Sequence, residues 1–169
     1  MRKLSLLLFL GLVLALVACS TDVFLQQPYQ VRLEPAQLGY EVDDQGKITV
    51  VPNTAYVEVA PGAPGGYLER YEYRVVDDSG NEVSPGSSLG SGFVGVRVPP
   101  GYEEVEGQRR FVSATSAPFT FSLDGQVAVL HSQQGFPLNW RYQVTWYVIT
   151  SNRDTVSWKQ EYQIRMPMK

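Results

Sequence analysis

The residues that could do chemistry in this chain are few, and the first pattern among them is Gly-x-Ser-x-Gly. Gly86 to Gly90 read GSSLG, which puts Ser88 at the nucleophile position. That pattern serves hydrolases when a sharp turn between a strand and a helix exposes the serine beside a histidine and an acid. Here Gly, Ser and Pro surround it over 84–92, and His131 is the single histidine of the chain. We therefore predict a flexible loop over 84–92, no enzymatic activity, and a surface position at a strand end for His131.

Metal-ligating residues are equally sparse. With one histidine and one cysteine in the chain, a zinc site would have to be built from carboxylates, so the sequence predicts none. The run DDSGNE offers oxygen ligands at spacings like those of a calcium loop, from Asp77, Ser79, Asn81 and Glu82. It lacks the full Asp-x-Asp-x-Asp-Gly pattern, and the same residue types favour hairpin turns. We therefore predict a turn at 77–81 and neither a metal nor a cofactor.

The single cysteine, Cys19, stands at the end of an apolar N-terminal run. Arg2 and Lys3 precede this run, and a small residue, Ala18, comes directly before the cysteine. A charged head, a short apolar segment and a small residue at its end are typical of a secretory signal. The alternative is a membrane-spanning helix, but the run is shorter than the roughly 20 residues that cross a hydrocarbon core. We therefore expect residues 1–18 to be a cleaved signal peptide.

The four residues Leu16-Val17-Ala18-Cys19 resemble the lipobox of bacterial lipoproteins. The resemblance is confined to the signal segment. It implies that the Cys19 thiol receives a diacylglyceryl group, that cleavage follows between Ala18 and Cys19, and that residues 19–28 are a lipidated tether. Two or more acyl chains hold a protein stably on a membrane. The resemblance further implies a location in the cell envelope, on the extracytoplasmic side of a membrane, and Ser20 favours the outer membrane in a cell that has two.

Composition excludes several partners. Loss of Arg2 and Lys3 with the signal leaves 12 basic against 17 acidic residues, a net charge of −5. An acidic domain whose longest basic run is Arg109-Arg110 is a poor binder of nucleic acid, because contacts to phosphate dominate that affinity. Once Cys19 carries lipid, no thiol remains for a disulfide or a cysteine nucleophile. A chain of this length supports one domain, which we place at 29–169.

Alternation of apolar and polar residues with a period of two predicts half-buried strands over most of the mature chain. The clearest pair is WRYQVTWYVIT and TVSWKQEYQIRM, joined by the turn SNRD at 151–154. Turns are also predicted at 43–47 and 77–81, and Asp124-Gly125 reads as a two-residue hairpin turn. No window shows the 3.6-residue period of an amphipathic helix, so we predict none in the mature domain.

Many short strands joined by turns predict an all-β domain, and uneven strand lengths favour a single antiparallel β-sandwich over a barrel. The runs YEYRVVDDSGNEV and WRYQVTWYVIT resemble the middle and closing strands of immunoglobulin-like or fibronectin type III-like domains, at the level of pattern only. The Cys…Trp…Cys core of true immunoglobulin domains is absent. A resemblance of this kind implies a fold and no activity.

Aromatic side chains make up 12% of the chain, and their phase separates core from surface. Trp140, Trp146 and Trp158 share the inward phase of their strands and are predicted to lie in the core. Tyr56, Tyr67 and Tyr147 are out of phase with their core neighbours and are candidates for a surface contact patch. Two Gly/Pro-rich loops, 61–66 and 84–92, are expected at one end of the sandwich, where binding residues are common.

We therefore expect a membrane-anchored lipoprotein of the cell envelope whose β-sandwich is a non-enzymatic module for a protein partner or a structural role. The alternative is a glycan-binding module with the three out-of-phase tyrosines as its platform. An exposed row of aromatic rings would favour glycan, whereas an apolar patch or a free sheet edge would favour protein.

Overall fold

The computed structural model describes residues 27–84, 86 and 88–165. The signal segment, Cys19, most of the expected tether and Met166 lie outside these residues. The elements, in chain order, are β1 (Tyr29–Glu34), β2 (Gly39–Val42), β3 (Ile48–Val51), β4 (Asn53–Val59), β5 (Gly66–Val76), β6 (Leu89–Val98), β7 (Tyr102–Val105), β8 (Gln108–Phe111), β9 (Ala114–Thr115), β10 (Phe119–Phe121), α2 (Gly125–Gln133), β11 (Arg141–Thr150) and β12 (Thr155–Gln163).

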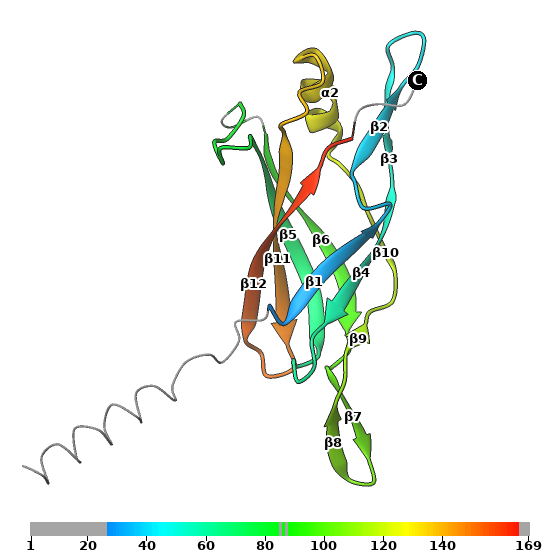
Figure 1. Cartoon of the computed structure of the whole chain (residues 1–169), viewed down its shortest axis with the longest axis vertical. Helices are drawn as coiled ribbons and strands as arrows, with labels where there is room; N and C mark the ends of the chain where they lie inside the picture. The colour runs from blue at the N-terminus through cyan, green and yellow to red at the C-terminus, as the bar shows by residue number, and fades with distance from the viewer. Residues whose placement is uncertain (1–26, 85, 87, 166–169) are drawn as a thin grey trace, which may run out of the picture.

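Two antiparallel sheets face each other, so the all-β sandwich-like fold expected from the sequence is confirmed (Figure 1). The first sheet has the order β1-β4-β10, with β9 also paired to β4. The second has the order β12-β11-β5-β6. Among the described residues, no helix is both long enough and apolar enough to cross a membrane.

The period-two pattern of the last two strands accounts for the centre of the second sheet. Alternate residues of β11 are buried from Tyr142 to Thr150, and β12 pairs with β11 in unbroken register. Trp146 therefore lies directly opposite Trp158. All three tryptophans are at most 7% exposed, which confirms their predicted place in the core.

Aromatic rings fill the space between the sheets. Phe121 of β10 packs against Trp146 of β11 with ring centroids 4.9 Å apart. On the second sheet, Tyr73 stacks on Tyr142 at 4.6 Å. Burial of such large rings is the main stabilising contribution to a domain of this size.

One open side of the sandwich is closed by a glutamine. Gln160 of β12 accepts a hydrogen bond from the backbone N–H of Val31 at 2.9 Å and donates one to the Val31 carbonyl at 2.7 Å. The Tyr162 hydroxyl donates to the same carbonyl at 3.0 Å. These contacts connect the edge strands β1 and β12 without a regular ladder between them.

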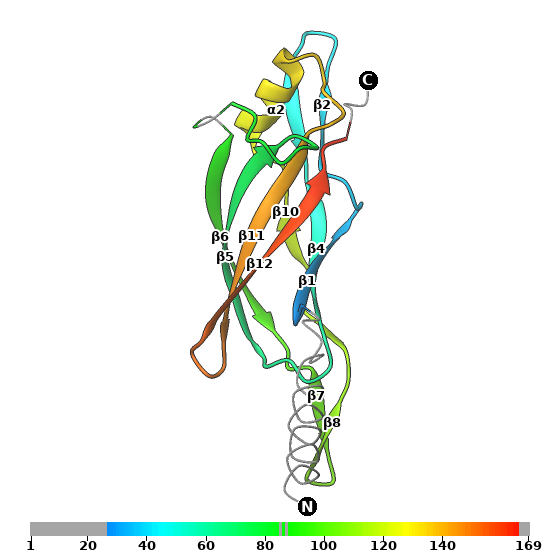
Figure 2. The same ribbon diagram turned by 60° about the vertical axis from the view of Figure 1, so that its left-hand side comes forward.

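Two hairpins extend the sandwich at opposite ends, as Figures 1 and 2 show. The β2–β3 hairpin lies beside α2 at one end, and the β7–β8 hairpin projects from the other. The first described residues and the start of β1 lie toward the β7–β8 end, because Tyr29 pairs with Val59, next to the loop that follows β4.

The Gly/Pro-rich loops do not share one end, so that prediction is wrong. Gly66 at the start of β5 pairs with Val98 at the end of β6, whereas Arg74 pairs with Leu89. The loop 61–66 therefore lies at the β7–β8 end, and the described residues of 84–88 lie at the other. The strand β6 begins at Leu89, so residues 89–92 of the predicted loop 84–92 belong to a strand.

The prediction of no helix is wrong for residues 125–133. The Asp124 carboxylate accepts a hydrogen bond from the backbone N–H of Gln126 at 2.8 Å, and Asp124 is the N-cap of α2 instead of part of a hairpin turn. The helix buries Val127, Ala128 and His131 and packs against β3. Apolar residues also occupy its outer side, including Val129, which obscured the helical period in the sequence.

The predicted turns after β2 and β5 are confirmed. In each, an aspartate carboxylate accepts hydrogen bonds from backbone N–H groups two and four residues later, and a glycine adopts positive φ. Asp43 and Gly46 fill these places in one turn, and Asp77 and Gly80 fill them in the other. The side chain oxygen of the aspartate holds the backbone in the turn, and glycine tolerates the left-handed conformation.

Candidate functional site

The most exposed large apolar side chain among the described residues is Phe93, in the middle of β6. Its side chain is 86% exposed, and Leu89 on the same face of the strand is 51% exposed. β6 ends the second sheet, and β5 is the strand that pairs with it (Figure 2). None of the described strands pairs with the other edge of β6, which leaves that edge open for a further strand.

The phase of the β5–β6 ladder shows which backbone groups face that free edge. The Val75 N–H donates to the Ser88 carbonyl at 3.0 Å, and the register continues from Arg74↔Leu89 to Arg70↔Phe93. In an antiparallel pair, successive residues point their N–H and C=O groups alternately toward and away from the partner strand. The backbone groups of Leu89, Ser91 and Phe93 therefore point outward.

A bulge ends this flat edge. The register changes from Arg70↔Phe93 to Leu68↔Val96, so β6 has one residue more than β5 between these pairs. Gly95 within the bulge has a φ of 73°. A bulge twists an edge strand and stops regular pairing, so the edge open to pairing is 89–93.

The other long edge strands carry the features that prevent pairing with a foreign strand. β12 presents Lys159 and Glu161 and is joined to β1 through Gln160. β1 presents Arg32 and Glu34, which form an ion pair with each other. Charged side chains are the usual protection of an exposed edge. Within β6 the one charged residue is Arg97, beyond the bulge.

The three candidate tyrosines do not form one patch. Tyr56 lies on β4 in the first sheet, where the Arg32 guanidinium lies 4.7 Å from its ring centroid. Tyr67 and Tyr147 lie on β5 and β11 of the second sheet. Tyr67 pairs with Ile149, two residues along β11 from Tyr147, so these two are diagonal neighbours. Tyr67 is the most exposed of the three, at 58%.

The Tyr147 ring is covered on one side. The Arg70 guanidinium lies 3.8 Å from the ring centroid, and the Tyr147 hydroxyl donates to the Glu72 carboxylate at 2.9 Å. That hydrogen bond raises the pKa of Tyr147, and together with Arg70 it lowers the pKa of Glu72. A ring that already stacks with arginine has only its other face for a ligand.

A polar ladder continues across the same face. Arg74 donates to Gln143 at 2.7 Å, and Gln143 donates to Glu161 at 2.7 Å. The centre of the outer face of the second sheet is thus occupied by cross-strand hydrogen bonds, and the exposed apolar groups lie at its β6 margin.

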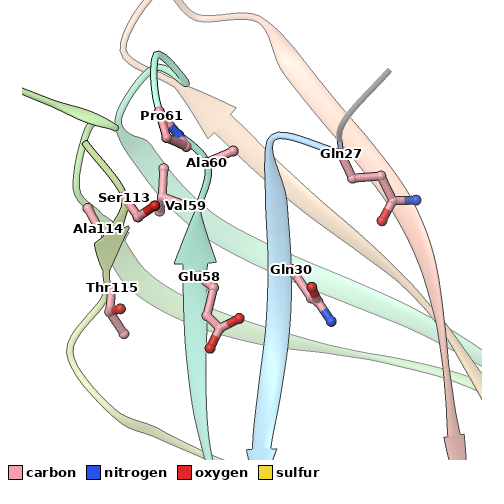
Figure 3. Close-up of a pocket in the computed structure, with 9 residues that line it drawn as sticks. All are labelled: Gln27, Gln30, Glu58, Val59, Ala60, Pro61, Ser113, Ala114 and Thr115. Atoms are coloured by element: carbon pink, nitrogen blue, oxygen red, sulfur yellow. The ribbon is translucent and has the colours of Figure 1, made fainter. Parts of the chain in front are cut away.

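A polar depression of about 510 Å³ lies beside the start of β1, between β1, β4 and β9 (Figure 3). It is open to solvent, and sequence reasoning did not find it, because β9 reaches β4 only through a long connection. Glu58 in its wall is bound to Arg32 at 2.7 Å. Within the described part of the chain no aromatic ring lines it, and its lining residues are Gln27, Gln30, Glu58, Val59, Ala60, Pro61, Ser113, Ala114 and Thr115. Amides and hydroxyls of this kind suit water or a short polar segment.

Ser88 and His131 do not form a catalytic pair in this structure. Ser88 is buried, and its hydroxyl donates to the Ser84 carbonyl at 3.3 Å. His131 is also buried, on α2, so its predicted surface position is wrong. One ring nitrogen, Nδ1, lies 2.7 Å from the Tyr40 hydroxyl, and the other, Nε2, lies 3.0 Å from the Pro137 carbonyl. Burial lowers the pKa of His131. Both nitrogens are thus engaged in packing α2 against β2 and the chain after the helix.

The Asp77 carboxylate is hydrogen-bonded within the turn at 77–81. Oδ1 accepts from the backbone N–H groups of Ser79 and Asn81, both at 2.9 Å, and Oδ2 accepts from the Asn81 amide at 3.3 Å. These hydrogen bonds lower the pKa of Asp77. Across residues 27–84, 86 and 88–165, no group of three or more His, Cys, Asp or Glu side chains is arranged to hold a metal ion.

No protein-family model matches this sequence, and no curated protein matches it either. Sequence reasoning missed the β6 edge because Gly90 and Gly92 read as loop residues, although Val94, Val96 and Val98 alternate in the pattern of a strand.

Proposed function

We propose that this protein is a membrane-anchored lipoprotein of the cell envelope whose immunoglobulin-like sandwich is a non-enzymatic module for protein contact. The contact surface is the free edge of β6 with its exposed apolar side chains, Leu89 and Phe93. The observation that carries this proposal is an unprotected edge strand with Phe93 at 86% exposure, beside other edges that carry charges. Exposed apolar groups on an open edge are typical of strand-pairing sites.

The lipobox-like residues Leu16 to Cys19 support the anchor. A tether of residues 19–28 reaches at most about 3.5 Å per residue, or roughly 35 Å in all. It would enter the domain at the start of β1, on the end that carries the β7–β8 hairpin. With two or three acyl chains, the domain stays on the extracytoplasmic face of its membrane.

Protein fits this surface better than glycan. Sugar rings stack on open aromatic faces, but Arg32 and Arg70 lie over Tyr56 and Tyr147. Among the described residues, no arginine lies over the Tyr67 ring, but a single ring is a small platform. The apolar margin at Leu89 and Phe93 favours a partner that buries apolar side chains and completes the sheet.

The anchor is tested by Cys19→Ser in the full chain. The proposal expects loss of the lipid from the N-terminal peptide in mass spectrometry and an unprocessed or soluble protein in fractionation. An unchanged, processed membrane fraction would contradict the lipid anchor. Ser20→Ala is the matched control and should retain both lipid and membrane association.

The contact surface is tested by cross-linking in native membranes followed by co-purification. Phe93→Ser should reduce the recovery of protein partners, whereas Tyr67→Ser on the neighbouring strand should not. Recovery of polysaccharide that depends on Tyr67 and not on Phe93 would replace protein with glycan as the partner class.

A further inference from the structure

We propose that the strand taken up by the β6 edge is β6 of a second copy of this chain, in an antiparallel pair centred on Ser91. This inference rests on the proposed use of the β6 edge for protein contact and names the partner. The two copies would form one continuous sheet across their second sheets. Such an interface is isologous, since the same surface on both copies is used.

The backbone supports this register. Leu89, Ser91 and Phe93 are the residues whose N–H and C=O groups point outward. A twofold axis at Ser91 places Leu89 opposite Phe93 of the second copy, and each Ser91 opposite the other. Every outward-facing residue then meets an outward-facing residue, as a hydrogen-bonded antiparallel pair requires. A shift by one residue would place outward groups opposite inward ones and break the ladder.

The side chains are complementary to themselves in the same register. Leu89 and Phe93 lie on the outer face and would pack as two apolar cross-strand pairs, one on each side of the axis. Aromatic–aliphatic pairs of this kind stabilise antiparallel sheets. On the inner face, Gly90 of one copy meets Gly92 of the other, and neither adds a side chain that could collide.

The bulge limits the extent of the interface. Pairing is confined to 89–93, and Arg97 lies beyond Gly95 at the bulge. Five residues a side is far fewer than the roughly 20–30 of a standard interface, so the pair is expected to be weak in dilute solution. Anchoring to a membrane raises the effective concentration and favours the pair there.

The pairing also determines how the domain lies. The twofold axis of an antiparallel edge pair is perpendicular to the sheet, so the starts of the two β1 strands are far apart and on the same side of the extended sheet. Both tethers then reach one membrane when the first sheet, which contains β1 and β4, faces it. The outer face of the extended second sheet points away from the membrane.

The experiment uses the full chain in membranes and a single engineered thiol. Ser91→Cys places two thiols on the axis, where the Cα atoms of a hydrogen-bonded pair lie about 5.5 Å apart, within the range that a disulfide spans. Mild oxidation should convert this variant to a disulfide-linked dimer. Ser157→Cys on β12 is the matched control, because Ser157 is exposed on the outer face of the same sheet. Leu89→Cys is the register control, since its two thiols would lie about four residues apart along the strands.

Dimer from Ser91→Cys and little from either control supports the proposal. Equal cross-linking of Ser91→Cys and Ser157→Cys, or none with Ser91→Cys, overturns it. If the chain without an engineered cysteine forms a disulfide-linked dimer, Cys19 must carry a free thiol, which would contradict the lipid anchor. The comparison of Ser91→Cys with Ser157→Cys is then made in the Cys19→Ser background, where it still decides the dimer.

A charge variant provides a test that needs no disulfide. Ser91→Lys places two like charges opposite each other across the axis, which disfavours the pair. Chemical cross-linking in membranes should fall by about fivefold, the equivalent of about 1 kcal/mol. Ser157→Lys should leave it unchanged. Pairing at β6 is contradicted if cross-linking is unchanged in both lysine variants, or if it falls equally in both.

Discussion

The Tyr71 ring lies over Gly92 of the neighbouring strand, and a Cβ on Gly92 would come within 2.6 Å of the ring carbon Cζ. Gly90 has the same relationship to Tyr73. Rings that cross from one strand to cover glycines on the next are a known way to stabilise an edge. Gly90 and Gly92 are therefore part of the core packing and not signs of a flexible loop.

Gly92→Ala should destabilise the domain by about 1–3 kcal/mol, because the added methyl group forces Tyr71 out of its packing against Phe121 and Trp146. Chemical denaturation measures the change in the free energy of unfolding. Ser91→Ala, on the exposed face of the same strand, is the control and should have little effect. Equal stability of the two variants would mean that the Tyr71 ring can move aside without lowering the free energy of unfolding.

Gln160→Ala should cost about 1–3 kcal/mol of stability, because it leaves the buried N–H and C=O of Val31 with fewer partners. Gln163→Ala is the matched control, since the side-chain oxygen of the exposed Gln163 accepts a hydrogen bond only from the amide of half-buried Gln37, at 2.8 Å, among the described residues. Hydrogen exchange at the Val31 N–H should rise in the first variant and not in the second. Unchanged exchange would show that β1 and β12 are held together without Gln160.

Asp124→Ala should cost about 1 kcal/mol through loss of the N-cap of α2, whereas Asp124→Asn keeps a side-chain acceptor and should cost less. Thermal unfolding of the two variants compares them directly. If alanine and asparagine prove equivalent, the hydrogen bond to the Gln126 N–H does not contribute to the stability of the helix.

Stability should fall as the pH drops below about 6.5, because burial lowers the pKa of His131 in the folded state. The unfolded chain then takes up a proton before the folded chain does. The neutral histidine makes its full contribution to the free energy of unfolding above about pH 6.5. Below that pH this contribution falls by at most about 1.4 kcal/mol per pH unit. Tyr40, the hydroxyl partner of His131, has a pKa raised to about 12 by burial and does not titrate in this range.

Denaturation at pH 7.5 and pH 5.5 measures this effect, with His131→Gln as the comparison. The variant should be less stable at pH 7.5 and should lose less between the two pH values than the parent chain. Parallel losses in both proteins would assign the pH dependence to other groups.

The sequence by itself determined the strands whose two faces differ. In β11 and β12, alternation of residues such as Trp146 and Tyr147 predicts which side chain is buried, because successive residues of a strand point to opposite faces. Turns were predictable for the same local reason, since Asp77 and Gly80 satisfy a turn within a few residues. The lipobox-like run ending at Cys19 is also a local pattern, and the expectation drawn from it is independent of the fold.

Only the tertiary structure decided the features that depend on distant partners. His131 is buried because α2 packs against β3 and brings it to Tyr40, 91 residues away. Gly90 and Gly92 become strand because the rings of Tyr73 and Tyr71 cover them. The open edge of β6 exists because β5 pairs with one side of it and no other described strand reaches the second. These are contacts between residues far apart in the chain, and no local pattern of residue types encodes them.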